Sequence, residues 1–190
     1  MYHIYHTEGI ILASTATGES DRFFQILTPD LGLIPAVARG SRALASKLKY
    51  HLVDHAYIGL DLVRGKDVWT ITGVMPFPEH SHDTDVRPEM IRLSSFIRRL
   101  VHGQEPSHEL FHTVFSVKTY LNESPSDEER DIILLSVYVH ILALLGYASN
   151  LSGLEKIGET SFGVDTIERV RAQQHAITRD VERILSETQL

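Results

Sequence analysis

Short apolar runs separated by turn-forming residues dominate the first 76 positions of the chain. The turns are ATGESD after the first run, TPDLG after the second and RGKD after the fourth. The runs are rich in β-branched and aromatic residues, and they read TEGIILAST, RFFQILT, LIPAVA, VDHAYIGLDLVRG and DVWTITGVM. Five strands at this spacing, with no helical period among them, predict a small antiparallel β-barrel.

The pattern changes at PFPEHSHDTDVRPE, which combines three prolines with several acidic residues. We interpret residues 77–89 as a linker, because apolar positions recur with the helical period after them. The expected helices run from Met90 to about Gly103, over 107–123 with Ser107 as N-cap, from SPSDEERD to Gly146, and over 164–187. The fold class is therefore α+β, with a barrel domain over 1–76 and an all-α domain over 90–190.

The third expected helix is apolar on all sides, which is typical of a central, buried helix. Its segment IILLSVYVHILALLGYA contains His140 and is shorter than the roughly 20 apolar residues of a membrane span. No signal-peptide pattern precedes the first strand. We therefore expect a soluble, cytoplasmic protein. The last helix is amphipathic, and either packs on the other helices or pairs with a second chain.

Charge is divided unevenly along the 190 residues, whose formal net charge is −7. Residues 1–76 hold seven basic and seven acidic side chains, so the whole excess of acid lies in 77–190. Within the first part, AVARGSRALASKLKYHL (36–52) contains Arg39, Arg42, Lys47 and Lys49 but no Asp or Glu. Because long-range repulsion is weakest there, a polyanion is expected to bind the N-terminal part.

Several motifs together resemble the RecO recombination-mediator family. The residues that carry the resemblance are HTEGIIL, the GESDRFFQILTPDLGLIPAVARGSR stretch, DLVRGKDVWTITGVM and, after an apolar helix, ALLGYASNL. The resemblance spans most of 6–150. It implies an OB-fold followed by a helical domain, and a DNA repair protein that binds single- and double-stranded DNA, anneals complementary strands and helps to load recombinase.

The same resemblance implies how such a protein works in the cell. It implies no catalytic residue and no small-molecule substrate or membrane partner. The implied partners are DNA, RecR and single-strand DNA-binding protein, and the implied place is the nucleoid within the cytoplasm. The alternative is a protein-bridging adaptor of the recombination machinery that has little DNA affinity of its own.

Three features depart from the family pattern, and one of them is that the basic stretch after Gly40 is thinner than usual. The family often carries a four-cysteine zinc element after the LGY region, but this sequence contains no cysteine. We therefore expect no zinc and no other cofactor. Basic residues are often found in the helix before LGY, where this sequence has Leu135, Ser136 and Val137. The helix thus lacks the cations that usually bind the tail of single-strand DNA-binding protein.

The predicted nucleic-acid site combines cations that neutralise phosphates with an aromatic ring that stacks on bases. A solvated basic loop without a ligand is the alternative. Tyr57 and Trp69, on predicted strands, are left unassigned between stacking surface and core. The predicted site residues are Arg39, Arg42, Lys47, Lys49, Tyr50, Arg64 and Lys66.

Other polar groups favour structural interpretations. In TGESDRFF no His or nucleophile elbow supports catalysis, so Gly18 and Ser20 suit a turn and Asp21 pairs with Arg22 or a backbone amide. His140 is expected to be buried, neutral and hydrogen-bonded. Pairs of histidines invite a metal interpretation, but no HExxH motif or evident third ligand supports one, and no metal site is assigned; the pairs are His51/His55, His80/His82 and His108/His112.

Overall fold

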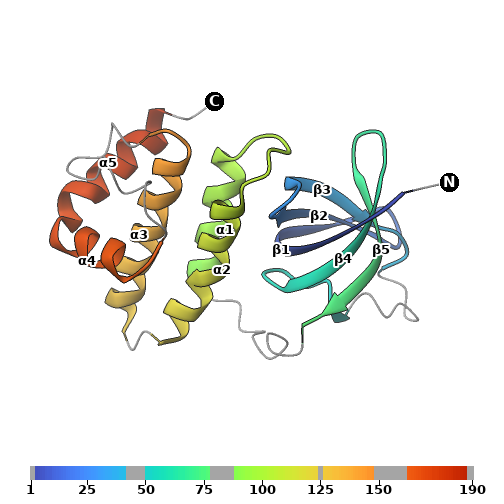
Figure 1. The fold of residues 1–190 in the computed structure, drawn as a ribbon, viewed down its shortest axis with the longest axis horizontal. Coiled ribbons are helices and arrows are strands. Elements are labelled where there is room, and N and C mark those ends of the chain that lie inside the picture. Colours follow the sequence, from blue (N-terminus) through green and yellow to red (C-terminus); the bar gives the residue numbers. More distant parts are fainter. Residues whose placement is uncertain (1–2, 42–49, 78–87, 124–125, 148–161, 188–190) are drawn as a thin grey trace. The chain divides into compact units, whose positions relative to one another are not determined.

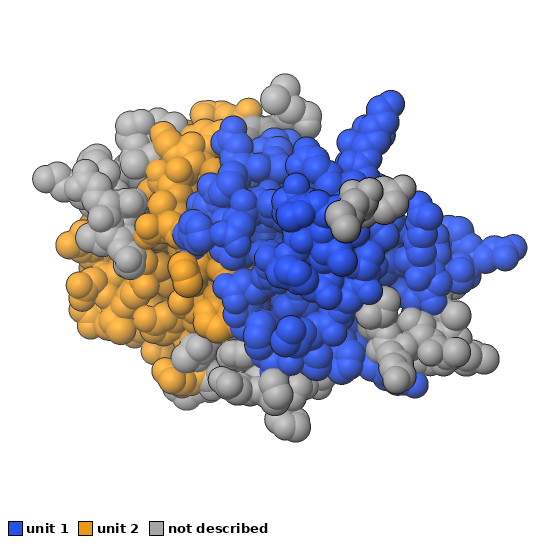
Figure 2. Space-filling model, turned by 45° about the vertical axis from the view of Figure 1, so that its right-hand side comes forward, with its two compact units in different colours: residues 1–108 blue, residues 109–190 orange. Residues whose placement is uncertain are grey.

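The computed structural model describes residues 3–41, 50–77, 88–123, 126–147 and 162–187. The chain divides into two compact units, Met1–His108 and Glu109–Leu190 (Figure 2). Among the described residues, no helix combines the length and apolar character that a membrane crossing requires.

The first unit is built on a closed five-stranded barrel (Figure 1). Its strands pair in the order β1-β2-β3-β5-β4, which confirms the predicted number of strands and the barrel. All pairings are antiparallel except a short parallel one between β3 and β5. The strands are β1 (Ile4–Thr17), β2 (Asp21–Thr28), β3 (Gly32–Ala38), β4 (Tyr57–Arg64) and β5 (Trp69–Pro76).

Alternating side chains from all five strands fill the inside of the barrel. Trp69 and Ile71 point inward and are only 2% and 4% exposed, which settles which face of β5 is the core. Leu52, from the segment before β4, is fully buried in the same cluster. The basic segment between β3 and β4 therefore returns to the core at Leu52.

Helix α1 (Pro88–Leu100) belongs to the same compact unit as the barrel. It contacts β1, and the Arg98 Nε donates a hydrogen bond to the Gln25 side chain on β2. Proline is well suited to the first position of a helix, since its missing N–H has no intrahelical partner there. Most of the predicted linker, 77–89, lies outside the described residues. The compact units divide after His108, so α1 accompanies the barrel.

The second unit is helical and is organised around α3. Ser126 caps α3, its Oγ accepting the Glu129 N–H at 3.2 Å. Helix α3 contacts both α4 and α5, which confirms its central position within this unit. The helices are α2 (His108–Glu123), α3 (Asp127–Leu144), α4 (Val164–Ala172) and α5 (Gln174–Glu187).

The prediction of one helix over 164–187 is wrong, because the helix is interrupted at Gln173. That residue has φ −126° and ψ 21°, outside the helical range. Its carbonyl then accepts the N–H groups of Ala176 and Ile177, which starts the first turn of α5. The apolar residues of α5, Ile177, Val181 and Ile184, are buried within the chain, so α5 packs on its own unit.

Candidate nucleic-acid interface

The predicted DNA-binding residues that the structure describes are exposed on the barrel. Arg39 lies in the turn after β3, Arg64 ends β4, and Lys66 lies in the β4–β5 hairpin. Tyr50 is 71% exposed, which leaves its ring accessible for stacking. Arg42, Lys47 and Lys49 lie outside the described residues.

The strand order places the two cationic segments at the ends of β3 and β4, two strands that both pair with β5. Ala36 of β3 pairs with Trp69 of β5, and Trp69 pairs with Arg64 of β4. The turn that follows β3 holds Arg39, and the hairpin that follows β4 holds Lys66. Residues that are far apart in the sequence therefore belong to one sector of the barrel, formed by β3, β5 and β4.

Arg64 is oriented by the aromatic residue beside it. Its guanidinium carbon lies 5.2 Å from the centre of the Trp69 ring, a cation–π contact. The indole Nε1 donates to the Gln104 Oε1 at 3.2 Å, which fixes the ring. Because Trp69 is buried, it cannot stack on a base; it supports a cation that can reach a phosphate.

Tyr5 is a candidate stacking residue that the sequence did not single out. It is 37% exposed and packs edge-on against Trp69, with ring centres 5.1 Å apart. His3 packs edge-on against Tyr5 in turn, at 4.5 Å. The N-terminal MYHIYHT is rich in aromatic residues, but only the pairing of β1 with β4 shows that Tyr5 lies near Arg64.

Two adjacent residues of β2 hold both ends of the basic segment. The Asp21 Oδ1 accepts a hydrogen bond from the Gly40 N–H at 2.7 Å, which confirms the prediction that Asp21 pairs with Arg22 or with a backbone amide. The Arg22 Nη1 donates to the Leu52 carbonyl at 2.9 Å. The chain between Gly40 and Leu52 is thus fastened at its start and at its end.

Arg22 is itself held in a partly buried network. Its Nη2 donates to the Ser14 Oγ, and the Ser14 Oγ donates to the Asp54 Oδ1 at 2.5 Å. The guanidinium also lies 5.3 Å from the centre of the Phe24 ring. Arg22 is therefore a positioning residue, connected to the Asp54 carboxylate through the Ser14 hydroxyl.

The histidines show no shared metal-binding arrangement in the part of the chain that the structure describes, where no three His, Asp or Glu side chains lie so that they could hold one metal ion. His80 and His82 lie outside that part. The His108 Nε2 lies 3.6 Å from the Asp30 Oδ1. His140 is fully buried as predicted, with its Nε2 3.5 Å from the Glu109 Oε1.

Comparison with known proteins identifies the N-terminal part of the chain. Residues 1–76 match the family model described as recombination protein O N terminal. This domain is an OB-fold, in agreement with the five-stranded barrel. The matched residues end where the barrel ends, at Pro76.

Curated relatives extend the similarity beyond the barrel. The chain is 28% identical over 152 residues to the DNA repair protein RecO of Dehalococcoides mccartyi, covering 78% of this chain and 59% of that protein. With the RecO of Roseiflexus sp. it shares 29% identity over 154 residues, or 78% and 52% of the two chains. RecO from a second D. mccartyi strain is 46% identical over 71 residues, or 37% and 28%.

These relatives are all longer than the region they share with this chain. The chain spans between about a quarter and three fifths of their lengths. The barrel, the family model and the relatives that continue into the helical region agree with one another. Residues 1–76 therefore carry the N-terminal domain of the RecO family, and the chain is similar to DNA repair proteins RecO from the barrel into the helical region.

Proposed function

We propose that this chain binds DNA through the cations of the β4–β5 hairpin, Arg64 and Lys66, and through Arg39 and the basic segment that leaves β3. The observations that carry the proposal are the hydrogen bonds that hold this acid-free segment at Gly40 and Leu52 and the exposure of Arg39, Arg64 and Lys66. In this function the protein binds single and double strands, promotes annealing of complementary strands and assists recombinase loading, without catalysing a reaction.

The chemistry of this surface suits a flexible, negatively charged strand. Lysine and arginine neutralise phosphates and release counterions, which supplies sequence-independent affinity. Exposed Tyr50 and Tyr5 offer ring faces on which bases of any sequence can stack. Fastening the segment at both ends reduces the conformational entropy that binding must remove.

The partners and setting follow from the same proposal. RecR and single-strand DNA-binding protein are the proposed protein partners, and the cytoplasmic nucleoid is the proposed place of action. Neither zinc nor another cofactor is needed for binding by cations and rings. The names of the relatives support a role in DNA repair.

The test compares two variants, each lacking four basic side chains, in an annealing assay with labelled complementary oligonucleotides. Replacing Arg39, Arg42, Lys47 and Lys49 by Ala is expected to abolish most of the protein's acceleration of strand annealing. The control replaces exposed arginines of α4 and α5, Arg169, Arg171, Arg179 and Arg183, by Ala, with the same change in net charge. Equal loss in both variants would show that net charge, and not this segment, governs annealing.

A second candidate function is a protein-bridging adaptor with little DNA affinity. The acidic excess of residues 77–190 favours it, because that part repels phosphates. Pull-down with purified RecR or single-strand DNA-binding protein, alongside an oligonucleotide shift assay, separates the two functions. Tight DNA binding without either partner rejects the adaptor, whereas partner capture without a shift rejects the DNA-binding proposal.

A further inference from the structure

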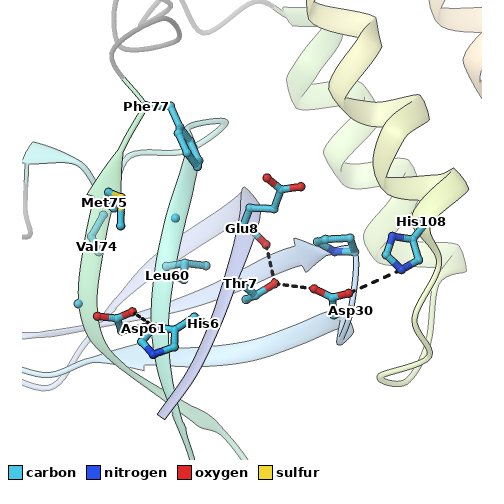
Figure 3. A pocket seen from close by; sticks show the side chains of 13 residues that line it. His6, Thr7, Glu8, Asp30, Leu60, Asp61, Val74, Met75, Phe77 and His108 are labelled. Carbon is cyan, nitrogen blue, oxygen red and sulfur yellow. Dashed lines mark hydrogen bonds and ion pairs between the residues drawn. The ribbon is translucent and has the colours of Figure 1, made fainter.

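A groove of about 730 Å³ lies in the barrel unit, and its chemistry differs from that of the predicted DNA-binding residues (Figure 3). Strands β1, β4 and β5, the β2–β3 turn, Phe77 and His108 contribute its walls. Among the described residues that line it there is no lysine and no arginine. We call it the acidic groove, after the carboxylates Glu8, Asp30 and Asp61.

The floor and one wall of the acidic groove are apolar. Val74 and Met75 of β5 contribute aliphatic surface, and Met75 is 65% exposed. Phe77 stacks on Tyr57, with ring centres 4.6 Å apart and an interplanar angle of 20°. The Tyr57 hydroxyl donates to the Glu8 carboxylate, which holds this aromatic pair beside a negative charge.

A glycine makes room for one of the carboxylates. A Cβ at Gly73 would lie 2.5 Å from the Asp61 Oδ2, a distance that real Cβ atoms do not show. Only glycine therefore lets Asp61 occupy its place across from β5. Its Oδ1 also lies 2.6 Å from the His6 Nδ1, and both side chains remain about half exposed or more.

The carboxylates of the acidic groove come from three different parts of the barrel unit. Glu8 lies on β1, Asp30 in the β2–β3 turn and Asp61 on β4. Asp30 accepts a hydrogen bond from the Thr7 Oγ1 at 3.4 Å and lies near His108, and it is 60% exposed. Three carboxylates without a lysine or arginine among them repel a phosphate backbone.

We propose that the acidic groove docks a basic and apolar segment of a partner protein. Carboxylates next to the Phe77 ring suit a lysine or arginine side chain, which gains both charge pairing and a cation–π contact. Val74 and Met75 suit an adjacent apolar side chain. This inference goes beyond DNA binding, and charge complementarity selects a protein segment over a nucleic acid.

The closed barrel defines how such a segment is held. Strands β4 and β1 pair along the whole groove, as do β4 and β5. A partner is therefore bound through its side chains, and not as an added strand. Specificity then depends on the spacing of its cationic and apolar side chains.

The probe is a short fluorescent peptide that alternates arginine with leucine, and its binding is followed by anisotropy. Replacing Glu8 by Gln and Asp30 and Asp61 by Asn is expected to weaken binding at least about tenfold. Met75→Ser is expected to weaken it about threefold, through lost apolar contact. The matched control removes three exposed carboxylates of the same unit, Glu19→Gln, Asp67→Asn and Glu105→Gln, and is expected to bind like the wild type.

Three results would overturn the proposal. The first is equal weakening in the control variant, which would indicate attraction by net charge alone. The second is unchanged binding when the peptide's leucines become serines. The third is displacement of the peptide by spermidine at a concentration similar to that of the peptide, which would indicate a site for small cations.

The groove variants also separate this inference from the proposed function. Oligonucleotide affinity is expected to be unchanged or higher in the groove triple variant, because negative charge is removed from the barrel. Emission from Trp69, the chain's single tryptophan, checks that the barrel is folded in each variant. Loss of peptide binding with DNA binding retained supports the groove, while loss of both with a folded barrel contradicts separate sites.

Discussion

Asp21 and Arg22 show how two neighbouring side chains can fix a segment that neither belongs to. Asp21 binds the amide at its start and Arg22 the carbonyl near its end. Sequence reasoning assigned Asp21 to a backbone amide or to Arg22, but it could not identify Gly40, because β2 and β3 meet only in the folded barrel. Tyr5 escaped notice for the same reason.

Asp21→Ala removes an acceptor and is expected to cost about 1 kcal/mol of stability, because the Gly40 N–H loses its partner. DNA affinity is expected to fall about threefold, since the loosened segment loses more entropy on binding. The slope of affinity against salt is expected to stay constant, because no phosphate contact is removed. Anisotropy titrations at several salt concentrations measure both quantities.

The control for this prediction is Asp21→Asn, which keeps the acceptor oxygen. It is expected to restore affinity close to the wild type. Arg39→Ala is the contrasting variant, since it removes a cation and lowers the magnitude of the salt slope by about 0.7 on single strands. A reduced salt slope in Asp21→Ala would contradict its assignment as a positioning residue.

Gly32 and Gly18 form a matched pair of left-handed turn residues, with φ of 69° and 57°. A Cβ at Gly18 meets no atom within 4 Å, whereas a Cβ at Gly32 would overlap the Glu105 backbone. Gly18→Ala is expected to cost about 1–2 kcal/mol, the usual penalty of this conformation. Gly32→Ala is expected to cost more, and urea unfolding followed by Trp69 emission measures the difference. Equal costs would contradict close packing at Gly32.

At the scale of elements, the periodicity of apolar residues predicted the strands and helices correctly where the buried positions follow that periodicity. The five strands and the central helix α3 lie where alternation and an all-apolar surface predict them. The break between α4 and α5 was missed because the apolar stripe continues across it, through Val170 and Ile177, and no proline or glycine marks it. The local geometry at Gln173, and not the pattern of burial, interrupts the helix.

The cap of α3 provides a test at this scale. Ser126→Ala leaves the Glu129 N–H without its side-chain acceptor and is expected to cost about 1 kcal/mol. Ser186→Ala, near the end of α5, serves as the control, since its hydroxyl donates to an exposed carbonyl. Its cost is expected to stay within about 0.5 kcal/mol. Far-UV circular dichroism during denaturation compares the two, and equal costs would contradict the capping role.

At the scale of the whole molecule, charge is sorted by surface more finely than the sequence indicates. Residues 1–76 are neutral in sum, yet Arg39 and the β4–β5 hairpin carry exposed cations while the acidic groove, lined in part by β4 and β5, carries carboxylates. Counting charges along the chain predicts that a polyanion binds the N-terminal part, which stays a prediction. It could not predict the groove, because His6, Asp30 and Asp61 become neighbours only when the barrel closes.

The most direct test of DNA binding by the basic segment is the affinity for a single-stranded oligonucleotide as a function of salt. Six cations, Arg39, Arg42, Lys47, Lys49, Arg64 and Lys66, predict a log–log slope of about −4 if each neutralises one phosphate. Replacing the first four by Ala is expected to bring the slope to about −1 and to weaken binding. A flat slope for the wild type, or unchanged affinity in the variant, would contradict DNA binding by this segment.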